Sequence, residues 1–266
     1  MKLFISADIE GCVGTTLASE THKERPEYQQ FARRMTEEVA IVCQAALEAG
    51  ASEIVVKDGH GDATNIDFTA MPEGVTLIRG KSGHPYNMMF GLDETFDGVL
   101  YVGYHSPAGC GGNPISHTST GNSNQILLNG KVMSEFMLNT YTAAMMGVPA
   151  VFISGDEAIC GLAKEMVPGI TTAAVKKGVG ASTINLSVAA ADQLLKEKVR
   201  EALSRDLKSC RIPMPEEFEY VVNYKDLKKA YQMSFFPGAE RIDERTNRVV
   251  SRDYKDIVTA HSFMVY

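Results

Sequence analysis

The chain has 266 residues, of which 44% are hydrophobic, and 33 acidic against 26 basic residues give a formal net charge of −7. This length and apolar content are typical of a globular protein with one substantial core, and the acidic balance argues against a nucleic-acid partner. The longest apolar stretches, such as Val148 to Ile153, are much shorter than the roughly 20 residues of a membrane-spanning helix.

The first residues and the cysteines favour a cytoplasmic protein. Asp8 and Glu10 interrupt the apolar run that follows Lys2 before the apolar core of a signal peptide could form. The five cysteines are an odd number and include no Cys-x-x-Cys pair, so we expect reduced thiols. We therefore expect a cytoplasmic protein that binds neither membrane nor nucleic acid.

The first part of the chain alternates between strand and helix signals. Lys2 to Ala7 is a β-prone run, and Pro26 to Ala49 shows apolar residues at helical spacing before a stop at Gly50. Glu53 to Val56 predicts the next strand, and strand, helix and strand together are typical of a right-handed crossover between parallel strands. The sequence predicts two further strands, Val75 to Ile78 and Gly98 to Tyr104.

The middle of the chain begins with a glycine-rich loop, Ser106 to Asn113. Gln125 to Met133 contains Asn129-Gly130 between apolar residues, which predicts a hairpin, and Ser134 is a suitable N-cap for a helix to about Met146. The sequence then predicts a strand and two helices: Pro149 to Ser154, Asp156 to Met166 and Ser187 to Leu203. These elements predict an α/β fold, a mostly parallel sheet with helices on both faces.

The pattern changes after Pro213. Phe218 to Asn223 alternates like a strand, Arg241 to Val250 is compatible with a hairpin, and Asp253 to Val265 is helical in its spacing. We therefore expect two parts: an α/β metal-binding catalytic domain over residues 1–205 and a smaller α+β portion over residues 206–266 that completes the subunit.

Candidate metal ligands follow three of the predicted strands. Asp8 and Glu10 follow the first, residues 58–60 with His60 follow the second, and His105 follows the strand that ends at Tyr104. Ligands of open α/β sheets bind outside the carboxyl ends of the strands, so we expect these side chains to lie close together. Glu135 is expected in the first turn of its helix. Two histidines and three carboxylates suit zinc, and carboxylates that can bridge favour two ions over one.

Each of these residues also has an ordinary structural interpretation. Asp8 and Glu10 could be a solvated strand end or an N-cap pair, and a single buried histidine is more often a hydrogen-bonded core residue than a ligand. His117 could be a further ligand, a catalytic group or an exposed loop residue. His22 and His84 are expected at the surface, whereas His261 has no clear interpretation. Cys12 lies beside the acidic pair and is expected to be a packing residue and not a nucleophile, because a nucleophilic thiol needs a histidine partner and the histidines suit metal binding better.

A set of motifs runs in order from residue 1 to about residue 176: MKLFISADIEG, VVKDGHGD, GLDETFDGVLYVGYHS, the SHT around His117, NGKVMSEFMLNTYTA, VPAVFISGDEA and TTAAVK. With these motifs the chain resembles a known family, the zinc D-aminopeptidases associated with bacterial dipeptide transport. The loop from Ser106 to Pro114 is richer in glycine than the family pattern, and the segment after residue 205 carries little of the signature. Both regions could shape the specificity pocket, so the preference for D- or L-residues does not follow from the resemblance.

The resemblance implies a two-zinc centre and a catalytic histidine at His117. The residues that match the family's zinc ligands are Asp8, Glu10, His60, His105 and Glu135, with Asp8 as the bridge between the ions. The resemblance also implies a homodecamer of two stacked pentameric rings that acts on small peptides with a free amino terminus. Two ions of this kind activate a water molecule for attack on the peptide carbonyl.

Two other functions remain open from the residues alone. A carboxylate and histidine centre also serves metal-dependent hydrolases that act on phosphoesters or cyclic amides. A catalytically silent metal-binding ring is the other alternative, although His117 has no necessary role in a passive metal site. The resemblance favours hydrolysis of peptides.

Overall fold

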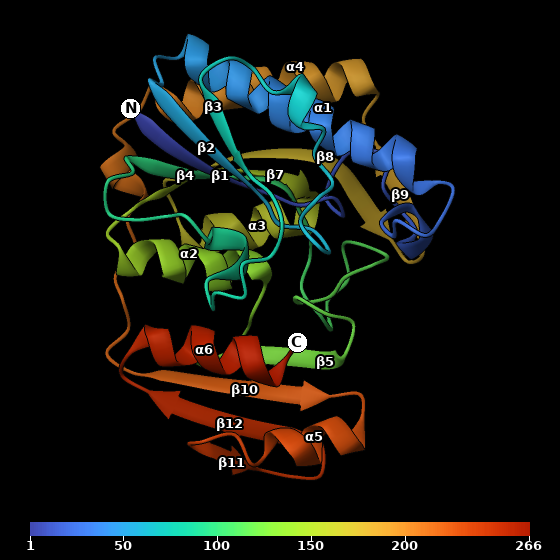
Figure 1. The fold of residues 1–266 in the computed structure, drawn as a ribbon, viewed down its shortest axis with the longest axis vertical. Helices are drawn as coiled ribbons and strands as arrows, with labels where there is room; N and C mark the ends of the chain where they lie inside the picture. Colours follow the sequence, from blue (N-terminus) through green and yellow to red (C-terminus); the bar gives the residue numbers. More distant parts are fainter.

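A computed structural model describes residues 1–266, and its larger part is built on a seven-stranded sheet. The strand order is β3-β2-β1-β4-β7-β8-β9, and all neighbours are parallel except β8 and β9 (Figure 1). The strands are β1 Lys2–Ala7, β2 Glu53–Asp58, β3 Val75–Ile78, β4 Gly98–Tyr104, β7 Ala150–Asp156, β8 Thr171–Val179 and β9 Ser182–Asn185. The strand order reverses between β1 and β4, the kind of place where α/β proteins bind their ligands.

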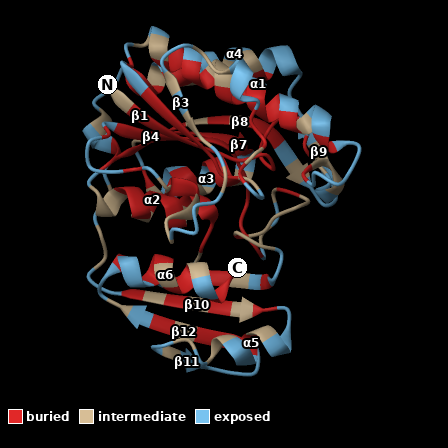
Figure 2. Cartoon of the chain, in the orientation of Figure 1, coloured by how far each residue is buried: buried red, intermediate tan, exposed pale blue.

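Helices cover both faces of this sheet, which confirms the predicted fold class. Helices α1 (Tyr28–Glu48) and α4 (Val188–Leu203) lie on one face, and α2 (Glu135–Met145) and α3 (Glu157–Met166) lie on the other (Figure 1). Strands β1, β4 and β7 are almost entirely buried, as expected of parallel strands between two helical layers (Figure 2).

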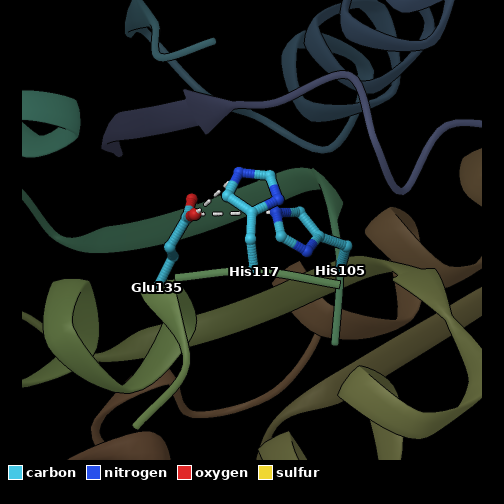
Figure 3. Close-up of side chains that lie close together, drawn as sticks. All are labelled: His105, His117 and Glu135. Carbon is cyan, nitrogen blue, oxygen red and sulfur yellow. Dashed lines mark ion pairs between the residues drawn. The ribbon is translucent and has the colours of Figure 1, made fainter. Parts of the chain in front are cut away.

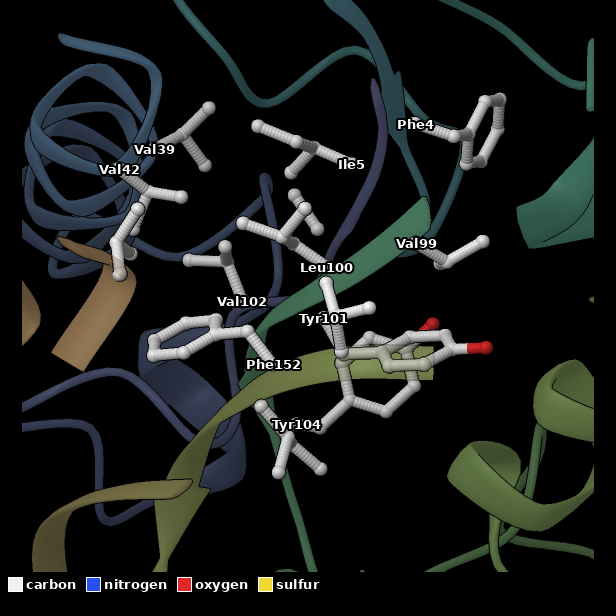
Figure 4. Close-up of a cluster of buried hydrophobic side chains, with 14 of the residues drawn as sticks. Phe4, Ile5, Val39, Val42, Val99, Leu100, Tyr101, Val102, Tyr104 and Phe152 are labelled. Atoms are coloured by element: carbon white, nitrogen blue, oxygen red, sulfur yellow. The ribbon is translucent and has the colours of Figure 1, made fainter. Parts of the chain in front are cut away.

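The core between α1 and the sheet follows from helical periodicity. Val39 and Val42, one turn apart on α1, point toward Ile5 of β1 and toward Leu100 and Val102 of β4 (Figure 4). All five side chains are fully buried. Removing this apolar area from water, at about 25 cal/mol per Å², is the main force that holds α1 on the sheet.

A second, antiparallel sheet has the order β11-β12-β10-β5-β6. Its strands are β5 Ser123–Leu128, β6 Lys131–Val132, β10 Phe218–Tyr224, β11 Ala239–Arg241 and β12 Thr246–Ser251, and the helices of this part are α5 Leu227–Met233 and α6 Tyr254–Met264. Helix α6 packs on this sheet and also contacts α2, so it lies between the two parts of the molecule (Figure 1). The sheet therefore includes the hairpin 123–132, which the division at residue 205 places in the first part.

Local sequence explains most element boundaries. Asn129 and Gly130 both have positive φ (50° and 75°), as the tight turn of a two-residue hairpin requires. Ser134 caps α2 through a hydrogen bond from the Met137 amide, and Asp253 caps α6. Helix α1 begins two residues after the predicted start at Pro26. Four short 3₁₀ helices complete the fold: η1 Ala18–Glu20, η2 Phe68–Ala70, η3 Asn87–Met89 and η4 Leu207–Cys210.

Candidate metal centre

The structure brings all six of the predicted site residues together. They come from the carboxyl ends of the neighbouring strands β2, β1 and β4, from the first residue of α2 and from the loop that follows β4. In chain order they are Asp8, Glu10, His60, His105, His117 and Glu135, and all six except His105 also line one cleft of about 510 Å³. The site lies where the strand order of the sheet reverses.

The two halves of the site meet at Asp8. On one side, His60 Nδ1 lies 3.1 Å from Glu10 Oε2 and 3.4 Å from Asp8 Oδ1. On the other, His105 Nε2 lies 3.5 Å from Asp8 Oδ2 and 3.5 Å from Glu135 Oε1. Two atoms that each lie about 2.1 Å from a tetrahedral zinc ion are about 3.4 Å apart, so these separations match ligands that share an ion.

His117 lies beside the second half of the site. Its Nε2 is 3.7 Å from Glu135 Oε1, and its ring stacks on that of His105 with centroids 4.4 Å apart (Figure 3). His117, His105 and Glu135 have donor atoms close enough together to hold one ion. The His117 side chain is 25% exposed against 1% for His105, so His117 borders the cleft while His105 is enclosed.

Main-chain carbonyls fix which nitrogen of each ring carries hydrogen. His60 Nε2 donates to Thr21 O at 2.8 Å, His105 Nδ1 donates to Ser106 O at 2.9 Å, and His117 Nδ1 donates to Ile115 O at 2.9 Å. A carbonyl only accepts, so the other nitrogen of each neutral ring turns a lone pair toward the carboxylates. This arrangement is typical of metal-binding histidines, whose second nitrogen is held by the protein.

Several buried polar atoms of the centre have no hydrogen-bond partner. They are Asp8 Oδ2, Glu10 Oε2 and His105 Nε2. An unpartnered buried polar atom is costly, and these three face a common space. A cation there would satisfy them together, and a nitrogen and oxygen donor set with no sulfur fits zinc.

The pKa values of these groups show how strongly the centre attracts positive charge. Burial and the nearby Glu10 raise the pKa of Asp8 to about 8. Burial alone would lower the pKa of His105, but its contact with Glu135 raises it to about 10. Burial likewise opposes ionisation of Glu135, but His105 lowers its pKa to about 2. Metal binding at such a centre displaces protons from its ligands.

Close main-chain contacts position the turn that carries Asp8 and Glu10. The Gly11 amide donates to Gly103 O at 2.8 Å, and a Cβ at Gly11 would lie 1.9 Å from Tyr104 O. Gly103 has a φ of +71°, and a Cβ there would lie 2.2 Å from Asp8 O. Only glycine fits at both positions. The turn and the end of β4, which precedes His105, are therefore in direct main-chain contact.

Buried side chains also support this turn. Lys176 Nζ donates to the carbonyls of Glu10 and Thr15, and Asn113 Nδ2 donates to Glu10 O at 3.0 Å. Cys12 is buried, and its thiol donates weakly to Asp8 O at 3.4 Å, as its predicted packing role requires. These contacts use the carbonyls of the turn and leave the carboxylates free for the centre.

His261 is a part of the site that the sequence does not reveal. The Ser119 amide donates to Glu135 Oε1 at 2.7 Å, and Ser119 Oγ is hydrogen-bonded to His261 Nε2 at 2.8 Å. His261 Nδ1 is hydrogen-bonded to the hydroxyl of Tyr220, in β10, at 2.8 Å. This chain of hydrogen bonds joins the second sheet to Glu135. Burial lowers the pKa of His261 to about 4, so the ring is neutral at physiological pH.

The remaining histidines lie outside the centre. His22 and His84 are both exposed, as predicted, although His22 also lines the outer part of the cleft. Asp58, at the end of β2, accepts hydrogen bonds from the amides of Asn65 and Ile66 and so orders the loop after His60. No helix of the structure combines the length and the apolar character that crossing a membrane requires.

Histidines and carboxylates gathered at the carboxyl edge of a parallel sheet, with a further histidine on the cleft side, are typical of metal-dependent hydrolases. A family model described as Peptidase M55, D-aminopeptidase, matches residues 1–263. The chain therefore belongs to the M55 peptidase family, the D-aminopeptidases. This membership confirms the predicted family and the predicted class of enzyme, an aminopeptidase.

Two comparisons with individual proteins agree with this membership. The chain is 30% identical over 266 residues to the D-aminopeptidase of Bacillus subtilis (strain 168), covering 100% of this chain and 96% of that relative. Its structure is similar to that of the Zn-dependent D-aminopeptidase DppA from Bacillus subtilis, described as a self-compartmentalizing protease. That match has a TM-score of 0.94 and 28% identity and covers 100% of this chain and 97% of that one.

Proposed function

We propose that this chain is a zinc-dependent aminopeptidase that holds two zinc ions per subunit and removes the first residue of short peptides. The observation that carries the proposal is the set of buried lone pairs of Asp8, Glu10 and His105 that face one another without hydrogen-bond partners. The name of the Bacillus subtilis structure, a Zn-dependent D-aminopeptidase, supports both the metal and the reaction.

The proposed ligands divide into two groups that share Asp8. Glu10 and His60 would hold one ion, and His105 and Glu135 would hold the other. Asp8 would bridge the two, since Oδ1 faces His60 and Oδ2 faces His105. Zinc in such a centre lowers the pKa of a bound water and polarises the scissile carbonyl.

His117 is proposed to move a proton during peptide cleavage. Its Nδ1 is fixed by the carbonyl of Ile115, so Nε2 is the atom that faces the cleft and can exchange a proton. From its position beside Glu135, this nitrogen could protonate the leaving amine or stabilise the oxyanion. Its closeness to His105 and Glu135 also suits a third ligand, and zinc retention in a variant without His117 separates the two roles.

The substrate and assembly are proposed from the family. We infer a small peptide with a free amino terminus, including peptides of D-amino acids, and a homodecamer of two pentameric rings. The description of DppA as self-compartmentalizing supports a homo-oligomer. The cytoplasmic location stays a prediction.

The proposed function is tested by metal analysis of the purified protein together with a screen of D- and L-aminoacyl amides and dipeptides. We expect two zinc ions per subunit and release of free amino acid that stops when a chelator removes the metal. Chromogenic phosphoesters, tested beside the peptides, should remain intact. Phosphoester hydrolysis without release of amino acids would contradict the proposal.

A further inference from the structure

The cleft beside the metal centre contains one lysine whose charge is not neutralised. Lys23 and Lys81 are the two lysines that line the cleft, and no arginine does. Lys23 Nζ forms an ion pair with Asp62 at 2.6 Å and also contacts Thr64. Lys81 has no ion pair and no hydrogen bond within the chain, so its ammonium group is free to bind an anion.

An aromatic ring accompanies the free ammonium group. Lys81 Nζ lies 4.6 Å from the centre of the Tyr266 ring, within the range of a cation–π interaction. Tyr266 also lines the cleft, and its hydroxyl is hydrogen-bonded to Asn87. The ring restricts the orientation of the Lys81 side chain. Because it carries no negative charge and accepts no hydrogen bond from Lys81, the N–H donors of the ammonium group stay available.

The main chain before Lys81 is fixed to the end of β2 and to the loop that follows His60. The Gly80 amide donates to Ala63 O at 2.6 Å, and Lys57 Nζ donates both to Gly80 O at 3.0 Å and to Asp58 O at 2.6 Å. Lys57 is only 1% exposed, so this contact is enclosed within the protein. The backbone at Lys81 is therefore held in place beside the end of β2, and its side chain lines the same cleft as the metal centre.

We propose that Lys81 binds the free carboxylate of the peptide substrate and thereby selects short peptides with an unblocked carboxyl terminus. The proposal rests on the proposed aminopeptidase function and names the group that recognises the other end of the substrate. A peptide of two or three residues spans about 7–10 Å, and a cleft of about 510 Å³ is suited to a ligand of that size. An ammonium group paired with a carboxylate forms a charge-assisted hydrogen bond, which a carboxamide cannot replace.

The test compares a dipeptide with its carboxamide, using the metal-loaded, full-length protein. We expect the wild-type protein to hydrolyse the free acid with a kcat/KM roughly tenfold above that for the amide. Lys81→Met should bring this ratio to about one by raising KM for the acid, while kcat/KM for the amide changes little. Lys81→Arg should keep most of the preference because it retains the charge.

Lys23→Met is the matched control. It removes a lysine from the same cleft, but this lysine already has a carboxylate partner, Asp62. We expect this variant to keep the wild-type ratio of acid to amide. The proposal is overturned if Lys81→Met keeps the wild-type ratio, if it lowers kcat/KM for both peptides in equal proportion, or if the wild-type protein does not distinguish them. Hydrolysis of neither peptide by the wild-type protein would instead contradict the proposed function.

Discussion

The two halves of the metal centre contain similar donor groups but are supported in different ways. His60 and Glu10 are held by the loops of the first sheet, through the carbonyl of Thr21 and the contacts of the turn after β1. Glu135 is held through Ser119 and His261, and so depends on the second sheet. The half that contains Glu135 can therefore be perturbed from the second sheet, whereas the half that contains Glu10 depends on residues of the first sheet and its loops, Lys176 among them.

Replacement of the shared residue should have the largest effect. Asp8→Ala removes the carboxylate whose two oxygens contact histidines of both halves, so we expect loss of both zinc ions and of all measurable peptide hydrolysis. Zinc content by plasma emission spectroscopy and release of amino acids give the two readouts. Retention of one ion per subunit would show that the halves bind metal independently.

His117→Ala should separate metal binding from catalysis. We expect both ions to remain while kcat falls by about 10²–10⁴-fold, because the group that exchanges protons at the cleft is lost. Metal analysis and steady-state kinetics on the same preparation provide the measurement. Loss of one ion in this variant would assign His117 to the ligands of the second half.

His261→Gln should weaken only the half of the centre that contains Glu135. Removal of its contacts with Ser119 and Tyr220 loosens the support of Glu135, and we expect about a tenfold loss of affinity for one zinc ion. Competition with a chromogenic chelator resolves the two affinities. Tyr254→Phe is the control, since it removes one buried hydrogen bond from the same helix, to Leu138 O, without touching Ser119. An equal loss of zinc affinity in Tyr254→Phe would show that the effect of His261→Gln is general destabilisation of the helix.

The same histidine should also make the stability of the protein depend on pH. The pKa of His261 is about 4 in the folded protein, because burial disfavours the charged ring, against an ordinary value of 6.5. Its contribution to stability is therefore complete above pH 6.5 and is lost as the pH falls toward 4, since only the unfolded chain takes up the proton. The difference corresponds to about 3 kcal/mol.

Urea unfolding of the metal-free protein at several pH values measures this contribution. Between pH 7 and pH 4, the free energy of unfolding of the wild-type protein should fall by about 3 kcal/mol more than that of His261→Gln. Other titrating groups are common to both proteins and cancel in the difference. Parallel curves for the two proteins would show that His261 does not titrate in this range.

The sequence predicted the first sheet and the gathering of the site residues well, because both follow from local patterns. The ends of β1, β2 and β4 are marked by polar residues after apolar runs, and parallel strands bring such ends together. Strand β8 was not predicted, since Lys176 and Lys177 interrupt its apolar pattern, although Lys176 is buried against the turn after β1. The seven-residue helix α5 was also missed, as it is too short for a periodic signal.

Contacts between residues far apart in the chain could not be predicted from the sequence. Asn129-Gly130 predicted a hairpin, but nothing local indicates that β5 pairs with β10, almost a hundred residues later. The hydrogen bond between Ser119 and His261 joins residues 142 positions apart, and neither has a local motif. Lys81 lies in a loop without periodicity, so its place on the cleft emerged only from the fold.

The contact between Gly11 and the end of β4 has a consequence for ionic size. Since main-chain atoms already touch there, the strand ends cannot separate without breaking hydrogen bonds of the sheet. The spacing between the main chains that carry Asp8 and His105 is thus fixed. Calcium prefers ligand distances of about 2.3–2.6 Å and six to eight oxygens, so it should be rejected by radius as well as by donor chemistry.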